Sequence, residues 1–127
     1  MSAGLRYHAA WRRLGLLLIA ADVYLSLSPG AGSVSVLPDK IAHFLVYAVL
    51  AFWFATLYPH AIGWIFAGLL ALGGTLEILQ GLGEARHAEW LDFGANLAGC
   101  LAGGGLVLLL PFNTFHWIET KLRPAAP

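Results

Sequence analysis

Four long apolar segments, separated by short polar or turn-forming stretches, dominate the hydrophobic pattern of the chain. The segments cover about 11–28, 41–58, 62–82 and 91–110. Each is long enough for an α-helix to cross a hydrocarbon core of about 30 Å. Their Leu, Ala and Gly-rich sequences show no period of two, which argues against the strands of a membrane barrel. The pattern therefore predicts an all-α fold, a polytopic transmembrane bundle of four helices.

Turn-forming residues separate the segments, with prolines and glycines at Pro38, Pro59, Gly83 and Pro111. The chain then divides into a basic N-terminal segment (1–13), a membrane domain (14–112) and a tail (113–127). We predict a short amphipathic helix at the membrane interface in the tail.

Composition supports a membrane protein. Of 127 residues, 59% are hydrophobic and only 11% are charged, and mean hydropathy is +0.74. Soluble domains are typically about 25% charged. Net charge is zero and no basic face is present, so we expect no nucleic-acid partner. The single cysteine, Cys100, excludes an intramolecular disulfide and is expected to be a small buried residue.

A cleavable signal peptide is the competing interpretation of the first segment, because a basic stretch precedes a short apolar run. The following residues, 28–33, contain no clear A-x-A-like cleavage site. We therefore expect this segment to remain as the first span.

Positive charges predict the orientation. Arg6, Arg12 and Arg13 precede the first span, and Lys121 and Arg123 follow the fourth. Four spans place all five on one side, so we predict an N-in, C-in topology with cytoplasmic ends. Both loops that contain most of the polar residues then face outward.

The polar residues of the membrane domain gather near the predicted outer surface. Ionisable groups inside a membrane are expensive and are functional candidates by default. Helical spacing places them on facing helix surfaces, and the candidate binding residues are Asp39, Lys40, His43, Tyr47, Glu77, Gln80, Arg86, Asp92 and Asn96.

Several chemistries fit these residues. His43, Glu77 and Asp92 are candidates for acid–base catalysis, and Lys40 with Arg86 suits a lipid phosphate at headgroup level. A zinc site from the same histidine and carboxylates lacks an H-E-x-x-H or comparable spacing, so no metal and no cofactor is predicted. Two further interpretations stay open: structural ties between helices, and a proton-coupled carrier.

Five short motifs resemble those of the VanZ-like family of small bacterial membrane proteins. They are Leu25-Ser26-Leu27-Ser28-Pro29, Asp39-Lys40-x-x-His43-Phe44-x-x-Tyr47, Glu77-x-x-Gln80, Arg86, and Asp92-x-x-x-Asn96-x-x-Gly99. The resemblance covers about residues 25–103. One departure is Glu89, which we expect to pair with Arg86.

The resemblance implies a multi-pass protein of the bacterial inner (plasma) membrane, with a link to glycopeptide resistance or exopolysaccharide production. We predict that the outward-facing site binds or processes a cell-envelope lipid or lipid-linked precursor, and a membrane protein partner is also considered. The alternative is a non-catalytic membrane scaffold or partner subunit. Whether the protein is an enzyme is left open.

Overall fold

The computed structural model describes residues 4–30, 37–83 and 89–123. These residues form an all-helical structure that contains no strand. Its elements are α1 (His8–Leu27), α3 (Asp39–Leu57), the 3-10 turn η1 (Pro59–Ala61), α4 (Ile62–Leu82), α5 (Trp90–Leu109) and α6 (Thr114–Lys121). The all-α prediction is confirmed, and the helix ends differ from the predicted ones by at most three residues.

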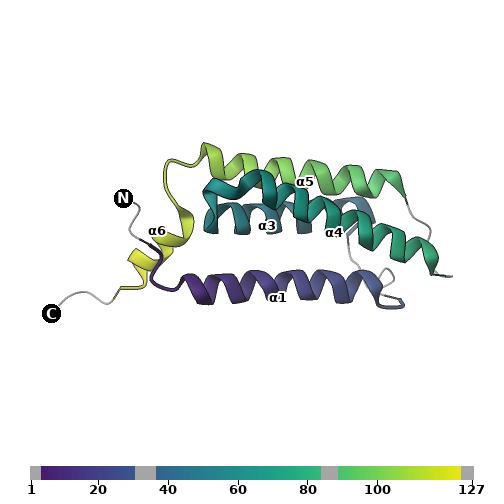
Figure 1. Cartoon of the computed structure of the whole chain (residues 1–127), viewed down its shortest axis with the longest axis horizontal. Helices are drawn as coiled ribbons and strands as arrows, with labels where there is room; N and C mark the ends of the chain where they lie inside the picture. Colours follow the sequence, from purple (N-terminus) through teal and green to yellow (C-terminus); the bar gives the residue numbers. More distant parts are fainter. Residues whose placement is uncertain (1–3, 31–36, 84–88, 124–127) are drawn as a thin grey trace.

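The four long helices run alongside one another as a bundle, and α6 lies across one end of it (Figure 1). The beginning of α1 also lies at this end, which we call the terminal end. The last turns of α1 and α4 and the first turns of α3 and α5 lie at the other end, which we call the polar end. Helix α3 is central: it contacts α1, α4 and α5, and its contact with α5 is the most extensive.

Within the described residues, three helical stretches are long and apolar enough to cross a membrane: Asp39–Leu57, Pro59–Leu82 and Trp90–Leu109. This confirms the prediction of a membrane protein at the level of length and composition. Helix α1 is not one of the three. It has 20 residues, about 30 Å at 1.5 Å per residue, but it carries Arg12, Arg13 and Asp22.

Large apolar side chains cover the outside of the bundle. Leu17, Leu108 and Leu109 are 64%, 72% and 82% exposed, and the exposed aliphatic surface extends over every long helix. A soluble monomer rarely exposes contiguous apolar surface of this extent. Trp64 and Trp90 are also exposed, at the beginnings of α4 and α5, where tryptophans of the interfacial belts are found.

Two glycines allow the close packing of α3 on α5. A Cβ atom at Gly99 would overlap the backbone of Phe44, and one at Gly103 would overlap the backbone of Ala48. Small residues at a helix interface let the two backbones approach in this way. The buried residues beside this contact include Tyr47 and Cys100, so the expectation of a buried cysteine is confirmed.

The predicted tail helix is present as α6, and Glu119 fixes the N-terminal segment to it. The carboxylate accepts hydrogen bonds from Arg6 N (2.8 Å), Tyr7 N (3.0 Å) and Trp11 Nε1 (2.8 Å). Burial acts to raise the pKa of Glu119, but these hydrogen bonds together hold the pKa below its ordinary value. Glu119 is therefore ionised at neutral pH, and its charge is satisfied by the chain's own N–H groups.

Candidate functional site

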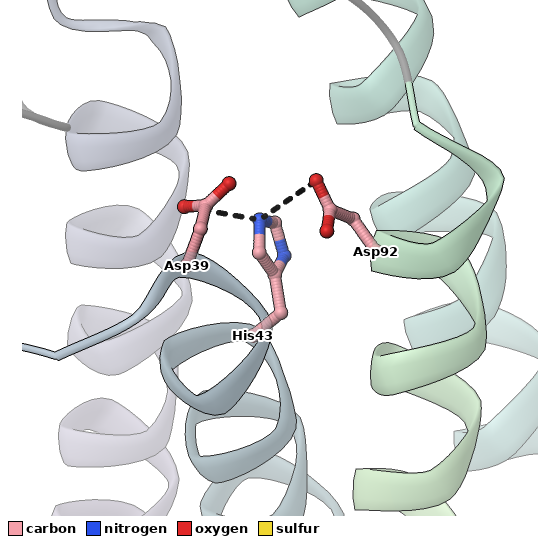
Figure 2. A group of neighbouring side chains, drawn as sticks. All are labelled: Asp39, His43 and Asp92. Carbon is pink, nitrogen blue, oxygen red and sulfur yellow. Dashed lines mark ion pairs between the residues drawn. The ribbon is translucent and has the colours of Figure 1, made fainter.

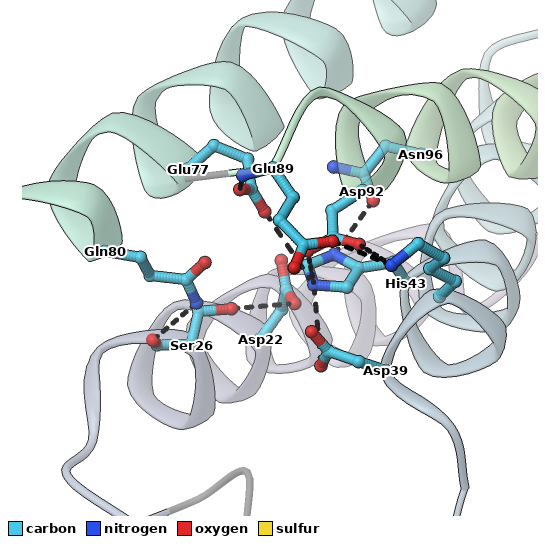
Figure 3. Close-up of polar contacts among 10 residues, drawn as sticks. Asp22, Ser26, Asp39, His43, Glu77, Gln80, Glu89, Asp92 and Asn96 are labelled. Atoms are coloured by element: carbon cyan, nitrogen blue, oxygen red, sulfur yellow. Dashed lines mark hydrogen bonds and ion pairs between the residues drawn. The ribbon is translucent and has the colours of Figure 1, made fainter. Parts of the chain in front are cut away.

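A cluster of polar side chains lies at the polar end of the bundle, where four helix ends meet (Figure 3). The first turns of α3 and α5 contribute to it, together with the last turns of α1 and α4. We use the name His43 cluster for the residues Asp39, Lys40, His43, Glu77, Glu89, Asp92 and Asn96.

His43 lies at the centre of the cluster and is 14% exposed. Its Nδ1 atom is 3.1 Å from Asn96 Oδ1. Its Nε2 atom lies 3.9 Å from Asp39 Oδ1, 3.8 Å from Glu77 Oε1 and 4.0 Å from Asp92 Oδ2. Three carboxylates from three helices therefore surround one ring nitrogen.

Lys40 lies at the exposed rim of the cluster. Its Nζ atom is 2.7 Å from Glu89 Oε2 and 3.6 Å from Asp92 Oδ1, and its side chain is 48% exposed. The hydrogen bond from Lys40 lowers the pKa of Glu89. Lys40 thus lies between two carboxylates, and its shorter contact is with Glu89.

Two carboxylates of the cluster are buried without full hydrogen bonding. Glu77 Oε2 accepts a hydrogen bond from Glu89 N at 3.3 Å, whereas Glu77 Oε1 has no such partner among the described residues. Asp92 Oδ1 likewise accepts no hydrogen bond within the described ranges, although Lys40 lies 3.6 Å away. Glu77 and Asp92 are only 6% and 4% exposed, so this arrangement costs free energy of folding.

Tyr47 and Gln80 are predicted site residues that take no part in the contacts within the His43 cluster described above. Tyr47 is buried one turn deeper on α3, and its hydroxyl lies beside the Asp22 carboxylate of α1. Gln80 Nε2 instead donates to Ser26 O of α1 at 2.7 Å. Gln80 is therefore a tie between α4 and α1.

Helix α1 contributes a residue that the sequence analysis left out of the site. Asp22 lies beside the His43 cluster in Figure 3, and its Oδ1 accepts a hydrogen bond from Ser26 Oγ at 3.5 Å. The signal in the sequence is the spacing of Asp22 and Ser26, which are one helical turn apart at the end of an apolar segment.

The cluster has an excess of acidic groups. Arg86, the second predicted phosphate ligand, lies outside the described residues, as does His87. Among the residues that are described, five carboxylates (Asp22, Asp39, Glu77, Glu89 and Asp92) lie around one lysine and one histidine. Such a site can hold or move protons and can attract cations, and Lys40 is its positive group at the exposed rim.

No family model matches the chain, and no curated protein or solved structure is detectably similar to it. The VanZ-like resemblance stays a prediction from the motifs.

Proposed function

We propose that the chain is a four-span protein of the bacterial inner membrane that binds the head group of an envelope lipid or lipid-linked precursor at the His43 cluster. The observation that supports this most strongly is the position of the cluster. Its rim residues, Asp39 and Lys40, are exposed where the apolar surface of α3 begins. In this proposal that position corresponds to the depth of lipid head groups.

In this proposal α1 also crosses the membrane, which brings the number of spans to four. Arg12 and Arg13 lie in its first turns and can extend toward the interface, while Asp22 contacts the polar end of the bundle. The basic residues at both chain ends, Arg6 and Lys121 among them, then lie on the cytoplasmic side by the positive-inside rule. The His43 cluster faces outward.

This orientation can be measured with single cysteines on a Cys100→Ala background. Leu37→Cys lies at the polar end and Thr120→Cys at the terminal end, and both positions are exposed. A membrane-impermeant maleimide should label Leu37→Cys in intact cells and Thr120→Cys only after permeabilisation. The opposite pattern would reverse the proposed orientation.

Lys40 is the proposed phosphate ligand among the described residues. A phosphate that approaches the rim competes with Glu89 for the Lys40 ammonium, because both anions need the same N–H donors. Arg86 is the second ligand by its position in the resemblance. In the catalytic form of the proposal, His43, Glu77 and Asp92 move a proton on the bound head group.

This mode of binding predicts opposite effects for the two partners of the Lys40 ion pair. Lys40→Ala should weaken binding about tenfold or more, since a hydrogen bond to a charged group contributes about 1.5–3 kcal/mol. Glu89→Gln should strengthen binding, because it removes the competing carboxylate. Native mass spectrometry of the purified protein, titrated with a polyprenyl phosphate or with phosphatidylglycerol, measures both effects.

Lys121→Ala is the matched control, since Lys121 is exposed at the terminal end. It should leave lipid binding unchanged, and Arg86→Ala should weaken it. Equal binding by all the variants, with unchanged melting temperatures, would refute lipid recognition at this rim.

The alternative function is a non-catalytic scaffold or partner subunit, in which the polar residues only hold the helices together. The hydrogen bond from Gln80 to Ser26 O is of this structural type. Lys40 thus favours lipid binding, whereas Gln80 favours the scaffold. The stability of a Glu77→Gln variant distinguishes the two functions.

A further inference from the structure

We propose that Asp39, His43, Glu77 and Asp92 form a binding site for one divalent transition-metal cation, with zinc as the representative ion. Figure 2 shows His43 between Asp39 and Asp92, with its ring directed into the space between α3 and α5. One ligand atom from each of these three residues lies within 4.8 Å of the other two.

The hydrogen bond at His43 Nδ1 determines which ring nitrogen can bind a metal ion. Asn96 Oδ1 is an acceptor, so Nδ1 carries the proton and donates it across 3.1 Å. In the neutral ring, Nε2 then presents a lone pair to three carboxylate oxygens at 3.8–4.0 Å. Lone pair and anions repel one another unless a cation, either a proton or a metal ion, lies between them. A metal-binding histidine is commonly oriented by such an acceptor at its other ring nitrogen.

Glu77 gives an independent indication that a ligand belongs here. It is 6% exposed, and its Oε1 atom has no hydrogen-bond partner within the described ranges. That oxygen belongs to α4 and lies 3.8 Å from His43 Nε2. An unpaired oxygen buried beside a histidine lone pair is costly in an empty site and is satisfied by a coordinated ion.

The distances and charges suit such an ion. Zinc binds nitrogen and carboxylate oxygen at about 2.0–2.2 Å, so the ligand atoms of a tetrahedral site lie about 3.3–3.6 Å apart. The three distances from His43 Nε2 are 3.8–4.0 Å, and small side-chain rotations close the remaining difference of about 0.5 Å. Two positive charges also offset part of the acidic excess around the site.

The donor set indicates which ion is preferred. Imidazole together with carboxylates suits zinc and the neighbouring transition metals, whereas calcium and magnesium prefer oxygen ligands alone. Asp39 is half exposed, so the coordination sphere has an open side toward the head groups. If the lipid proposal is also correct, a phosphate oxygen is the natural ligand at that side.

The sequence predicts no metal site here because no two of these ligands have a recognised zinc spacing. The spacing that matters is three-dimensional, since the four ligands come from α3, α4 and α5. Only the packing of these helices brings the ligands together.

The test uses the full chain in detergent, stripped with EDTA and free of added lipid and phosphate. Titration with zinc, followed by elemental analysis, should give one bound ion per chain and a raised melting temperature. Cobalt should give visible absorption bands of a low-symmetry site. His43→Gln should weaken zinc binding at least about 100-fold, the upper end of the range known for losing only an outer partner. Asn96→Ala should weaken zinc binding by about 10–100-fold, because Asn96 orients the His43 ring through its contact with Nδ1.

His60→Gln is the matched control, because His60 is exposed beside α4 at the terminal end, and it should bind zinc as the wild type does. If His43→Gln does not fold, Asp39→Asn decides, since Asp39 is half exposed and its exchange leaves the core intact. No bound zinc, or equal binding by wild type and the folded variant, would overturn the site. Zinc binding without lipid binding would overturn only the lipid proposal.

Discussion

Gly103→Leu is expected to separate α3 from α5 and to cause the largest loss of stability of any single substitution in the bundle. Even a Cβ atom at Gly103 would overlap the Ala48 backbone, and backbone cannot move aside as a flexible side chain can. Overpacking a core typically costs about 1–3 kcal/mol and occasionally more, and a whole leucine side chain against backbone should exceed this range. Gly103→Ala should lose about 1–3 kcal/mol.

The measurement is the free energy of unfolding in mixed detergent micelles, followed by circular dichroism. Gly105→Ala and Gly94→Ala are matched controls on the same helix, because a Cβ atom at either position meets nothing within 4 Å. Both controls should be neutral or slightly stabilising, since alanine favours helix by up to about 1 kcal/mol over glycine. Equal effects at Gly103 and Gly105 would contradict the close packing of α3 on α5.

The helices of this protein could be predicted from sequence because the signals are local. Long apolar segments, each ended by proline or glycine, define α3, α4 and α5 almost to the residue. The convergence of His43, Glu77, Asp92 and Asn96 was also predictable, since buried polar groups in an apolar bundle have only one another as partners.

The particular pairs could not be predicted in the same way, because they depend on how the helices rotate and how their ends overlap. Lys40 contacts Glu89, which we expected to pair with Arg86. Gln80 donates a hydrogen bond to a backbone oxygen of α1. The Glu119 anchor joins residues 108 to 113 positions apart in the chain. Residue spacing within one helix cannot predict contacts between different helices.

Glu77→Gln is the second substitution with a large expected effect, and it should act in opposite directions on folding and on binding. Glu77 Oε1 is buried without a hydrogen bond in the described part of the chain, and an uncompensated buried carboxylate costs several kcal/mol. The amide keeps an acceptor for the Glu89 N–H group and removes the charge. We expect unchanged or higher stability, by up to about 2 kcal/mol, together with a loss of zinc binding.

Gln80→Leu supplies the comparison on the same helix, one turn further along. The Gln80 side chain donates a hydrogen bond of 2.7 Å to Ser26 O, and a leucine at this position cannot form this link between α4 and α1. The expected loss is about 1–2 kcal/mol of stability with no effect on zinc binding, because Gln80 does not contact the His43 cluster's ligands. The pair of variants thus separates a structural tie from a ligand-binding group.

We propose that the His43 cluster binds a ligand and does not serve to hold the bundle together. The decisive measurement is the difference in unfolding free energy between Glu77→Gln and wild type, in EDTA and without added lipid. We expect Glu77→Gln to be at least as stable as the wild type. A loss as large as that of Gln80→Leu would show that Glu77 is a structural tie and would contradict this proposal.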